Sequence, residues 1–400
     1  MQTLAIHGGS PIRESTIFYG RQWIDETDIE AVCKVLRGNL ITCGPKVTEF
    51  EKTFAEYTNA QYTVAVNSGT SALHCACIAA DIHSGDEVIT TPLTFAASAN
   101  CILYCNGVPV FADIDPKTYN IDPESIESHI TDKTKAVIAV DYAGQAVNHT
   151  QIRKICDKHH LIFIEDAAHA IGTLYQEKPI GSLADMTCFS FHPVKTITSG
   201  EGGAITTNDP VFYNKLLCAH AHGIIHETKE LLDNLQEGPW YYEQISLGYN
   251  YRITDFQAAL LNNQLSRLEY FKQRRAEITD QYNKAFRDLE GIIIPKEIPE
   301  SNTCRHLYVV QLDLEKLTCT RRQFYDALSA EHIQPQVHYI PVYWFPYYQK
   351  LGYQKGLCPI AENLYQKIIS IPLYPKMTDQ DVQDVIDAVT KITTYYQKRF

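Results

Sequence analysis

Short apolar runs alternate with helical patterns over the first half of the chain, and this alternation constrains the fold more than any other feature of the sequence. Strands that alternate with helices indicate a mostly parallel sheet that is covered by helices on both faces. The sequence therefore predicts an α/β fold around a seven-stranded sheet. The predicted strands are at 62–66, 87–91, 109–114, 135–141, 161–165, 186–191 and 203–207, and the predicted helices that join them are at 71–80, 96–105, 123–129, 151–159 and 209–219.

The pattern divides the chain into four predicted parts. Residues 1–20 form an N-terminal arm, and residues 21–253 form a large domain that contains the sheet and ends in a polar, irregular region. A continuous helical pattern over 254–286 predicts a bridging helix to a smaller C-terminal α/β domain at 287–400. In that smaller domain we expect strands at 306–312 and 335–339, and helices at 321–331 and from 379 onward.

Composition excludes several classes of function. The chain has 400 residues, 45% of them hydrophobic, and a net charge of −12, which disfavours nucleic-acid and membrane partners. No apolar leader or membrane-length apolar segment is present, so we expect a cytoplasmic protein. The 12 cysteines are scattered without a CxxC pair, and the 15 histidines lack paired clusters at ligand spacing. We therefore expect reduced thiols and no metal site.

One lysine stands out at the end of the strand predicted at 186–191. Lys195 follows Pro193 and leads into a loop with three glycines, residues 196–203. A lysine on such a sheet-edge loop can form an imine with an aldehyde, provided that burial lowers its pKa and leaves the amine neutral. A solvated lysine in a glycine-rich loop is the alternative, and this stretch by itself leaves both interpretations open.

Other polar groups should gather at the same edge of the sheet, where ligands of parallel sheets bind. Asp166 ends a buried strand, and Thr94 and Phe95 follow another. The polar turn 67–71 opens a helix whose free N–H groups suit a phosphate. Ordinary helix capping is the alternative for this turn and for Asp166.

Together these groups match the needs of pyridoxal 5'-phosphate. Its aldehyde requires a lysine, its ring nitrogen requires a carboxylate that favours the protonated form, and its phosphate requires N–H donors. Nucleotide cofactors fit poorly, because the sequence has neither GxGxxG after the first strand nor GxxxxGK.

Specific motifs support the same cofactor. They are Asn67-Ser-Gly-Thr-Ser-Ala-Leu73, Glu165-Asp-Ala-Ala-His169, Phe189-Ser-Phe-His-Pro-Val-Lys195, Gly200-Glu-Gly-Gly203 and Gly248-Tyr-Asn-Tyr-Arg252. With them the chain resembles the DegT/DnrJ/EryC1/StrS family of sugar aminotransferases over nearly its whole length. This resemblance implies the pyridoxal-phosphate-dependent transferase fold of type I.

The resemblance also implies roles for individual residues. Lys195 would bind the cofactor covalently and move the proton, and Asp166 would pair with the pyridinium nitrogen. The other implied cofactor contacts are His169 at the phenolic oxygen, Phe95 on the ring face, Gly69, Thr70 and Ser190 at the phosphate, and Asn250 at the phosphate of the neighbouring subunit. The resemblance also implies that three residues contact the substrate: His338, Tyr339 and His222. Core packing remains the alternative for Phe95, and a structural role for His338. Where relatives often have an arginine, this chain has His220.

Three phrases resemble the branch of the family that acts in pseudaminic acid synthesis: 190–199, 237–244 and 338–342. The implied reaction moves the amino group of L-glutamate to the 4-keto group of UDP-4-keto-6-deoxy-L-AltNAc, in a homodimer with shared active sites. The alternatives are another dTDP- or GDP-linked keto sugar of perosamine type, or a non-catalytic cofactor-binding regulator. Deoxygenation is disfavoured, because the dehydratases of the family have histidine in place of the lysine.

Overall fold

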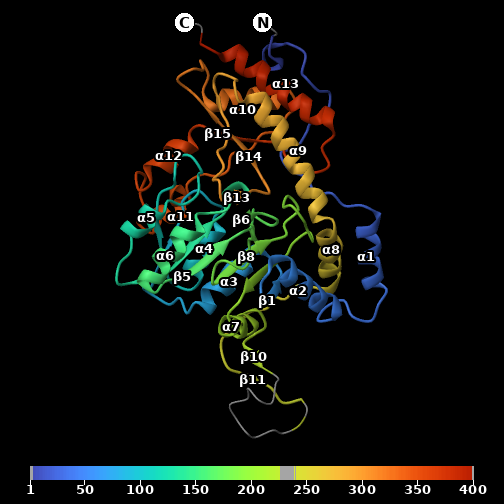
Figure 1. The fold of residues 1–400 in the computed structure, drawn as a ribbon, viewed down its shortest axis with the longest axis vertical. Helices are drawn as coiled ribbons and strands as arrows, with labels where there is room; N and C mark the ends of the chain where they lie inside the picture. Colours follow the sequence, from blue (N-terminus) through green and yellow to red (C-terminus); the bar gives the residue numbers. More distant parts are fainter. Residues whose placement is uncertain (1–2, 226–237, 239, 399–400) are drawn as a thin grey trace.

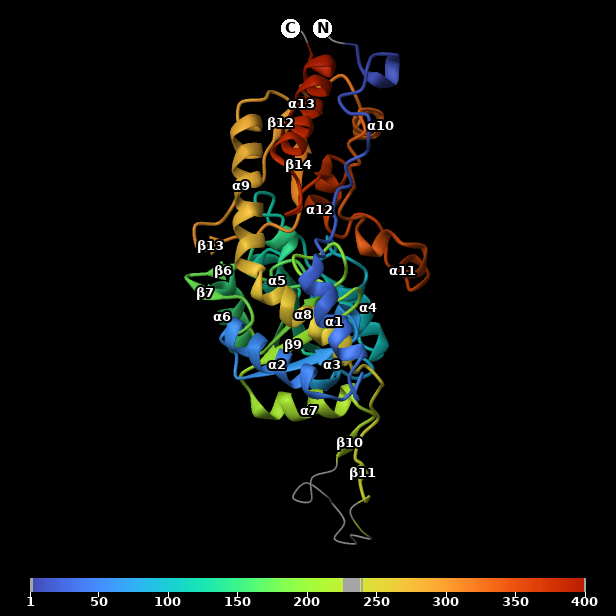
Figure 2. The same ribbon diagram turned by 90° about the vertical axis from the view of Figure 1, so that its right-hand side faces the viewer.

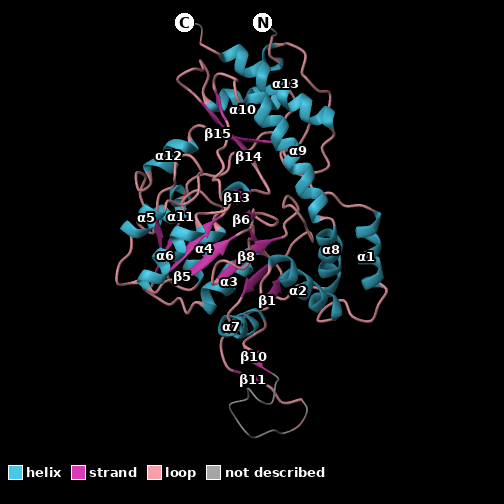
Figure 3. Ribbon diagram, in the orientation of Figure 1, coloured by secondary structure: helices cyan, strands magenta, loops and turns pink. Residues whose placement is uncertain are grey.

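A seven-stranded sheet lies at the centre of the protein, with helices on both of its faces (Figure 1, Figure 3). The structure is a computed structural model that describes residues 3–225, 238 and 240–398. All neighbouring strands from β8 to β3 are parallel, whereas β9 is antiparallel to both β1 and β8. The predicted α/β fold with a mostly parallel sheet is confirmed. The strand order is β1 (Tyr62–Val66), β9 (Gly203–Thr207), β8 (Met186–Ser190), β5 (Ile162–Asp166), β4 (Thr134–Val140), β2 (Glu87–Thr90) and β3 (Val108–Phe111).

Successive side chains of each strand point to opposite faces of the sheet, so that each face has its own core. Val64 and Val66 of β1 pack with α3, α4 and α7 on one face. Ala65, Phe163 and Phe189 belong to clusters with α2, α5, α6 and α8 on the other. These helices are α2 (Pro45–Thr58), α3 (Gly69–Ala79), α4 (Ala97–Tyr104), α5 (Pro123–Ser128), α6 (His149–His159), α7 (Pro210–His220) and α8 (Asp255–Ser266).

The C-terminal part is a smaller α/β unit, reached through helix α9 (Leu268–Phe286) (Figure 2). A three-stranded antiparallel sheet in the order β12-β14-β15 packs with α9, α10 and α13 around a separate core. Leu4 and Ile17 of the N-terminal arm belong to that core, and the two termini lie close together (Figure 1). The bounds are β12 (Ile292–Ile293), β14 (Tyr308–Leu312), β15 (Ile368–Ile371), α10 (Arg321–Ala330) and α13 (Asp379–Tyr396).

The remaining elements are short, apart from α1. They are η1 (Ala5–His7), α1 (Glu26–Leu36), η2 (Tyr142–Gly144), β6 (Leu174–Tyr175), β7 (Lys178–Pro179), β10 (Ile224–Ile225), β11 (Glu243–Gln244), β13 (Ser301–Asn302), η3 (Val342–Trp344), α11 (Pro346–Lys350) and α12 (Pro359–Tyr365). Among the described residues, no helix is both long and apolar enough to cross a membrane.

Two sequence predictions in the C-terminal half are wrong. The helix predicted over 254–286 is two helices, α8 and α9, which meet at Arg267. The strand predicted at 335–339 does not form: only Gln336 makes an isolated bridge, to Ser370 of β15, and the preceding Pro335 has no N–H to donate to a ladder. Of the phrase at 237–244, residues 237 and 239 lie outside the described residues.

Candidate active site

A cavity of about 630 Å³ lies at the carboxyl ends of the parallel strands, where open α/β sheets bind their ligands. Its wall combines the start of α3, the ends of β5 and β8, the loop after β8, a segment of the C-terminal unit and Tyr19 of the arm. It brings together nine of the residues that the sequence singled out: Gly69, Thr70, Phe95, Asp166, His169, Ser190, Lys195, His338 and Tyr339.

Lys195 lies in the cavity wall, on the loop that leaves β8. Its N–H donates to the carbonyl of His192 at 2.9 Å, which closes a turn, and Gly200 has a positive φ of 82° that favours glycine. Burial lowers the pKa of the Lys195 amine to about 8, although the nearby Asp166 carboxylate opposes this shift. About a tenth of the amine is therefore neutral and nucleophilic at pH 7, and this fraction grows as the pH rises toward 8.

Asp166 is a buried carboxylate with defined hydrogen-bond partners. Its Oδ2 accepts a hydrogen bond of 2.6 Å from the Ser98 hydroxyl, and its Oδ1 accepts one of 3.1 Å from the N–H of Ala168. Burial raises the pKa of Asp166, while these hydrogen bonds and Lys195 oppose the rise. No helix starts here, because the chain turns from β5 toward β6, so the alternative of a helix cap does not apply.

The start of helix α3 is open to the cavity. Ser68 caps the helix by accepting a hydrogen bond of 3.1 Å from the N–H of Ser71. This leaves the N–H groups of Gly69 and Thr70 without an acceptor among the described residues. A Cβ on Gly69 would lie 2.8 Å from the Cβ of Ser190, so only glycine allows this approach to β8. Free N–H groups beside a serine hydroxyl at a helix start are suited to an anion.

His169 is held between backbone and a tyrosine. Its Nδ1 accepts a hydrogen bond of 3.3 Å from the N–H of Ala143, and its Nε2 lies 3.1 Å from the hydroxyl of Tyr339. Burial keeps the pKa of His169 well below its usual value, so the ring is neutral. Since Nδ1 accepts, we assign the proton to Nε2, which donates to Tyr339.

His338 and Phe95 both line the cavity, but His338 is buried and Phe95 is exposed. His338 Nδ1 is 2.8 Å from the hydroxyl of Ser370, and burial lowers the pKa of His338 to about 3, so this ring is also neutral. Phe95 is 63% exposed, with its ring 6.4 Å from that of Tyr339. Core packing, the alternative for Phe95, is therefore wrong, and the ring is available to a ligand.

Two of the singled-out residues lie elsewhere. Asn250 is exposed and does not line this cavity; its carbonyl accepts a hydrogen bond of 3.5 Å from the side chain of Asn67. His222, which also does not line the cavity, donates its N–H to the carbonyl of Tyr249. His220 is the last residue of helix α7. Its Nδ1 lies 2.8 Å from the carbonyl oxygen of Leu217, so the ring is a hydrogen-bond partner for one of the last carbonyl groups of the same helix.

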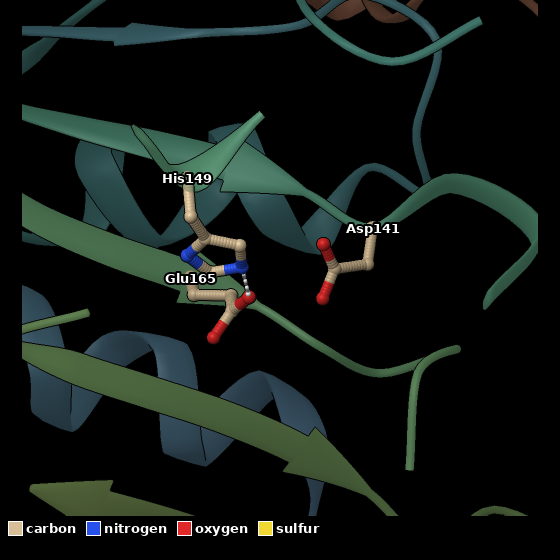
Figure 4. Close-up of side chains that lie close together, drawn as sticks. All are labelled: Asp141, His149 and Glu165. Carbon is tan, nitrogen blue, oxygen red and sulfur yellow. Dashed lines mark ion pairs between the residues drawn. The ribbon is translucent and has the colours of Figure 1, made fainter. Parts of the chain in front are cut away.

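Behind the cavity, the buried side chains of Asp141, His149 and Glu165 face one another (Figure 4). Nε2 of His149 and Oε1 of Glu165 form an ion pair of 2.7 Å, and Thr187 donates to the other oxygen of Glu165 at 2.8 Å. Burial would raise the pKa of Glu165, but His149 outweighs it and lowers that pKa. Nδ1 of His149 and Oδ2 of Asp141 have no hydrogen-bond partner among the described residues, so the three side chains satisfy one another only in part. They could also ligate a metal ion, so the expectation of no metal site stays a prediction.

The arrangement fits a known family. The chain matches the model of the DegT/DnrJ/EryC1/StrS aminotransferase family over residues 22–390. The chain belongs to this family. It is a pyridoxal-phosphate-dependent aminotransferase, and the cavity has a lysine, a buried carboxylate and an anion-binding helix start that fit this cofactor.

Several relatives and solved structures resemble this aminotransferase along its whole length. The spore coat polysaccharide biosynthesis protein SpsC of Bacillus subtilis is 43% identical, over 94% of this chain and 96% of that protein. The UDP-4-amino-4,6-dideoxy-N-acetyl-beta-L-altrosamine transaminase of Campylobacter jejuni is 36% identical, over 96% and 99%. The structure of Helicobacter pylori PseC, an aminotransferase of pseudoaminic acid biosynthesis, has a TM-score of 0.88 at 31% identity, covering 96% and 100%. The PLP-form of a Streptococcus pneumoniae sugar aminotransferase also has a TM-score of 0.88, at 29% identity, covering 95% and 99%.

Sequence reasoning missed two residues of this aminotransferase's cavity. Ser98 lies in α4, four positions after Thr94, and its hydroxyl lies 2.7 Å from that of Thr94. This spacing could have indicated that the two face the same edge. Tyr19 lies in an arm with no periodic pattern, and no local signal connects it with the sheet.

Proposed function

We propose that this enzyme transfers the amino group of L-glutamate to the 4-keto group of UDP-4-keto-6-deoxy-L-AltNAc. The product would be the 4-amino sugar nucleotide used in pseudaminic acid synthesis. The similarity to the Campylobacter jejuni transaminase, at 36% identity over nearly the whole of both chains, is the observation that carries this proposal. The phrases at 190–199 and 338–342 also support it, because their residues line the cavity at Ser190, Lys195 and His338.

In this proposal Lys195 is the catalytic residue. Bound pyridoxal phosphate supplies an aldehyde that carries the amino group and a ring that withdraws electrons from the reacting carbon. The amine of Lys195, with a pKa lowered by burial to about 8, holds the cofactor in the resting enzyme. When the amino donor has displaced it, the same amine accepts the proton from the α-carbon of glutamate and delivers it within the site.

Asp166 and the start of α3 hold the two ends of the cofactor. The Asp166 carboxylate, kept in place by Ser98 and Ala168, favours a protonated ring nitrogen. The free N–H groups of Gly69 and Thr70 and the hydroxyl of Ser190 bind the phosphate. His169 would hold the phenolic oxygen, and Phe95, whose ring is exposed, would pack against the cofactor ring.

We further propose a homodimer with shared sites, in which Asn250 of one protomer contacts the phosphate site of the other. Asn250 is exposed and lies outside its own cavity, which supports a role in a partner's site. It lies on the stretch that follows β11, close to Asn67, at the edge of the sheet beside α3.

A second candidate is amination of another keto-sugar nucleotide, linked to dTDP or GDP. The higher identity to SpsC, 43%, favours keeping it, because that relative is named for spore coat polysaccharide. The alternative of a non-catalytic regulator is set aside, because the chain belongs to an aminotransferase family and has a lysine with a lowered pKa beside a buried carboxylate.

The experiment that separates these candidates is a substrate panel. The holoenzyme is first incubated with glutamate, so that the cofactor carries the amino group. It is then mixed with UDP-, dTDP- and GDP-linked 4-keto-6-deoxy sugars, and amino-sugar formation is measured. We expect kcat/KM for UDP-4-keto-6-deoxy-L-AltNAc to exceed the others by about a hundredfold, because a polar pocket left with unpaired groups rejects analogues strongly. Equal values for UDP- and GDP-linked ketoses would contradict this substrate.

A further inference from the structure

The N-terminal arm is built into the C-terminal unit by backbone hydrogen bonds. The N–H of Ile17 donates to His332 at 3.0 Å, and the carbonyl of Ile17 accepts from Gln334 at 2.8 Å. Two residues further on, the carbonyl of Tyr19 accepts from the N–H of Leu373 at 3.1 Å. Tyr19 therefore has a fixed backbone position, with the arm running beside the C-terminal unit (Figure 2).

A buried carboxylate fastens the beginning of the arm. Glu331 has no exposed surface, and its two oxygens accept hydrogen bonds of 3.0 Å each from the N–H groups of Ala5 and Ile12. Lys391 neutralises its charge at 2.8 Å. Because a buried charge requires such partners, the arm and Glu331 stabilise each other.

The side chain of Tyr19 extends from this arm into the cavity wall. Its ring lies 5.3 Å from the ring of His338, and burial raises the pKa of its phenol, which is therefore protonated at neutral pH. The next residue, Gly20, lies beside Val194: a Cβ on Gly20 would be 3.4 Å from the Cβ of Val194, an ordinary contact distance. Tyr19 thus stands where the arm, the C-terminal unit and the loop of Lys195 meet.

Two other polar side chains on this side of the cavity each have one hydrogen-bond partner. The hydroxyl of Tyr339 accepts from His169, and Nδ1 of His338 is bonded to Ser370. The hydroxyl of Tyr19 has no hydrogen-bond partner in the part of the chain that the structure describes. A half-buried hydroxyl in a cavity wall gains a partner when a polar ligand replaces water there.

We propose that Tyr19 is a substrate-binding residue whose hydroxyl hydrogen-bonds a hydroxyl or acylamino group of the keto-sugar nucleotide. A neutral phenol suits these neutral groups, whereas the two carboxylates of an amino donor such as glutamate call for cations. Tyr19 therefore serves the half-reaction with the sugar and not the half-reaction with glutamate. This inference rests on the proposed function, since it needs a sugar substrate.

The test is Tyr19→Phe, which keeps the ring beside His338 and removes the hydroxyl. Single-turnover measurements follow the cofactor spectrum, first with glutamate and then with the keto-sugar nucleotide. We expect the rate with glutamate to stay within about twofold of wild type, and kcat/KM for the sugar to fall about tenfold, the usual effect of one lost hydrogen bond. Calorimetric binding of the amino-sugar nucleotide product should weaken by a similar factor.

Tyr347→Phe is the matched control, because Tyr347 is 60% exposed and lies outside the cavity. It should change neither half-reaction. Glu331→Gln tests the arm itself: it should cause the same selective loss with the sugar and speed proteolysis of residues 3–20. Equal losses in both half-reactions of Tyr19→Phe, or no loss in either, would overturn the proposal. A wild-type enzyme that aminates no keto-sugar nucleotide would instead refute the proposed function.

Discussion

The hydroxyl of Ser98 donates a hydrogen bond of 2.6 Å to the carboxylate of Asp166 and so joins the first turn of α4 to the end of β5. Thr94 lies 2.7 Å from the same hydroxyl and extends the chain of polar groups. Asp166 must stay ionised to hold a pyridinium nitrogen, although burial raises its pKa. Ser98 is therefore a positioning residue that favours the charged form of Asp166.

Replacing Ser98 should shift the pH dependence of the reaction. Ser98→Ala removes a hydrogen bond that lowers the pKa of Asp166, so that pKa rises. Since the reaction needs the ionised carboxylate, the acidic limb of kcat/KM for glutamate should move to higher pH. At neutral pH the rate should fall about tenfold. Ser128→Ala, at an exposed serine of α5, is the control, and an unmoved acidic limb in Ser98→Ala would contradict the role of Ser98.

Covalent uptake of the cofactor by the apoprotein should depend on pH through Lys195. Its amine reacts only when neutral, so the rate should rise with pH and level off above the pKa of about 8. In Asp166→Asn the midpoint should move to lower pH, because the carboxylate raises the pKa of Lys195. Stopped-flow absorbance measures the uptake rate against pH for the wild type and for Asp166→Asn. A midpoint near the value of a free lysine, about 10, would show that burial does not tune this amine.

The close contact between α3 and β8 should be essential for binding the phosphate. Gly69→Ala would place a Cβ 2.8 Å from the Cβ of Ser190, so the start of α3 must move away. We expect the Kd of the apoprotein for pyridoxal phosphate to rise about tenfold or more, since several hydrogen bonds to one anion are affected. Gly20→Ala, which meets Val194 at an ordinary distance of 3.4 Å, should bind the cofactor normally. An unchanged Kd in Gly69→Ala would remove the helix start from the phosphate site.

Mixing two inactive variants tests whether sites are shared between protomers. When Lys195→Ala and Asn250→Ala chains are unfolded and refolded together, about half of the dimers are mixed, and one site in each collects both changes. The other site is intact, so activity should return to about a quarter of wild type. Asn250→Ala alone must first be shown to be impaired. If mixing restores nothing, Asn250 serves its own subunit or no site.

Local patterns were sufficient to predict the large sheet. Its strands are short apolar runs separated by helices, and their carboxyl ends carry Lys195 and Asp166 into one cavity. Asp166 was predicted because it ends a buried strand, and Lys195 because it follows Pro193 and leads into a glycine-rich loop at the end of another strand. The family motifs added Gly69 and His169, whose placement in the cavity depends on backbone that no periodicity describes.

Contacts between distant parts of the chain determine the features that local sequence patterns failed to predict. A strand was predicted at 335–339 and none at 368–371, yet it is the run at 368–371 that pairs with β14 along its length. No glycine or proline marks the break between α8 and α9 at Arg267. Arg267 instead forms ion pairs with Asp25 and Asp28 near the start of α1. Tyr19 reaches the cavity only because the arm docks on the C-terminal unit, a contact between distant parts of the chain.

The central claim is that Lys195 carries the chemistry of this aminotransferase. Purified holoenzyme is treated with borohydride before any substrate is added, digested with trypsin, and mapped by mass spectrometry. Because its lowered pKa and its place in the cavity make Lys195 the reactive amine, the reduced cofactor should be found on Lys195 at close to one per chain. The Lys195→Ala protein should retain none after the same treatment. A label on any other lysine, or none in the wild-type enzyme, would contradict the account.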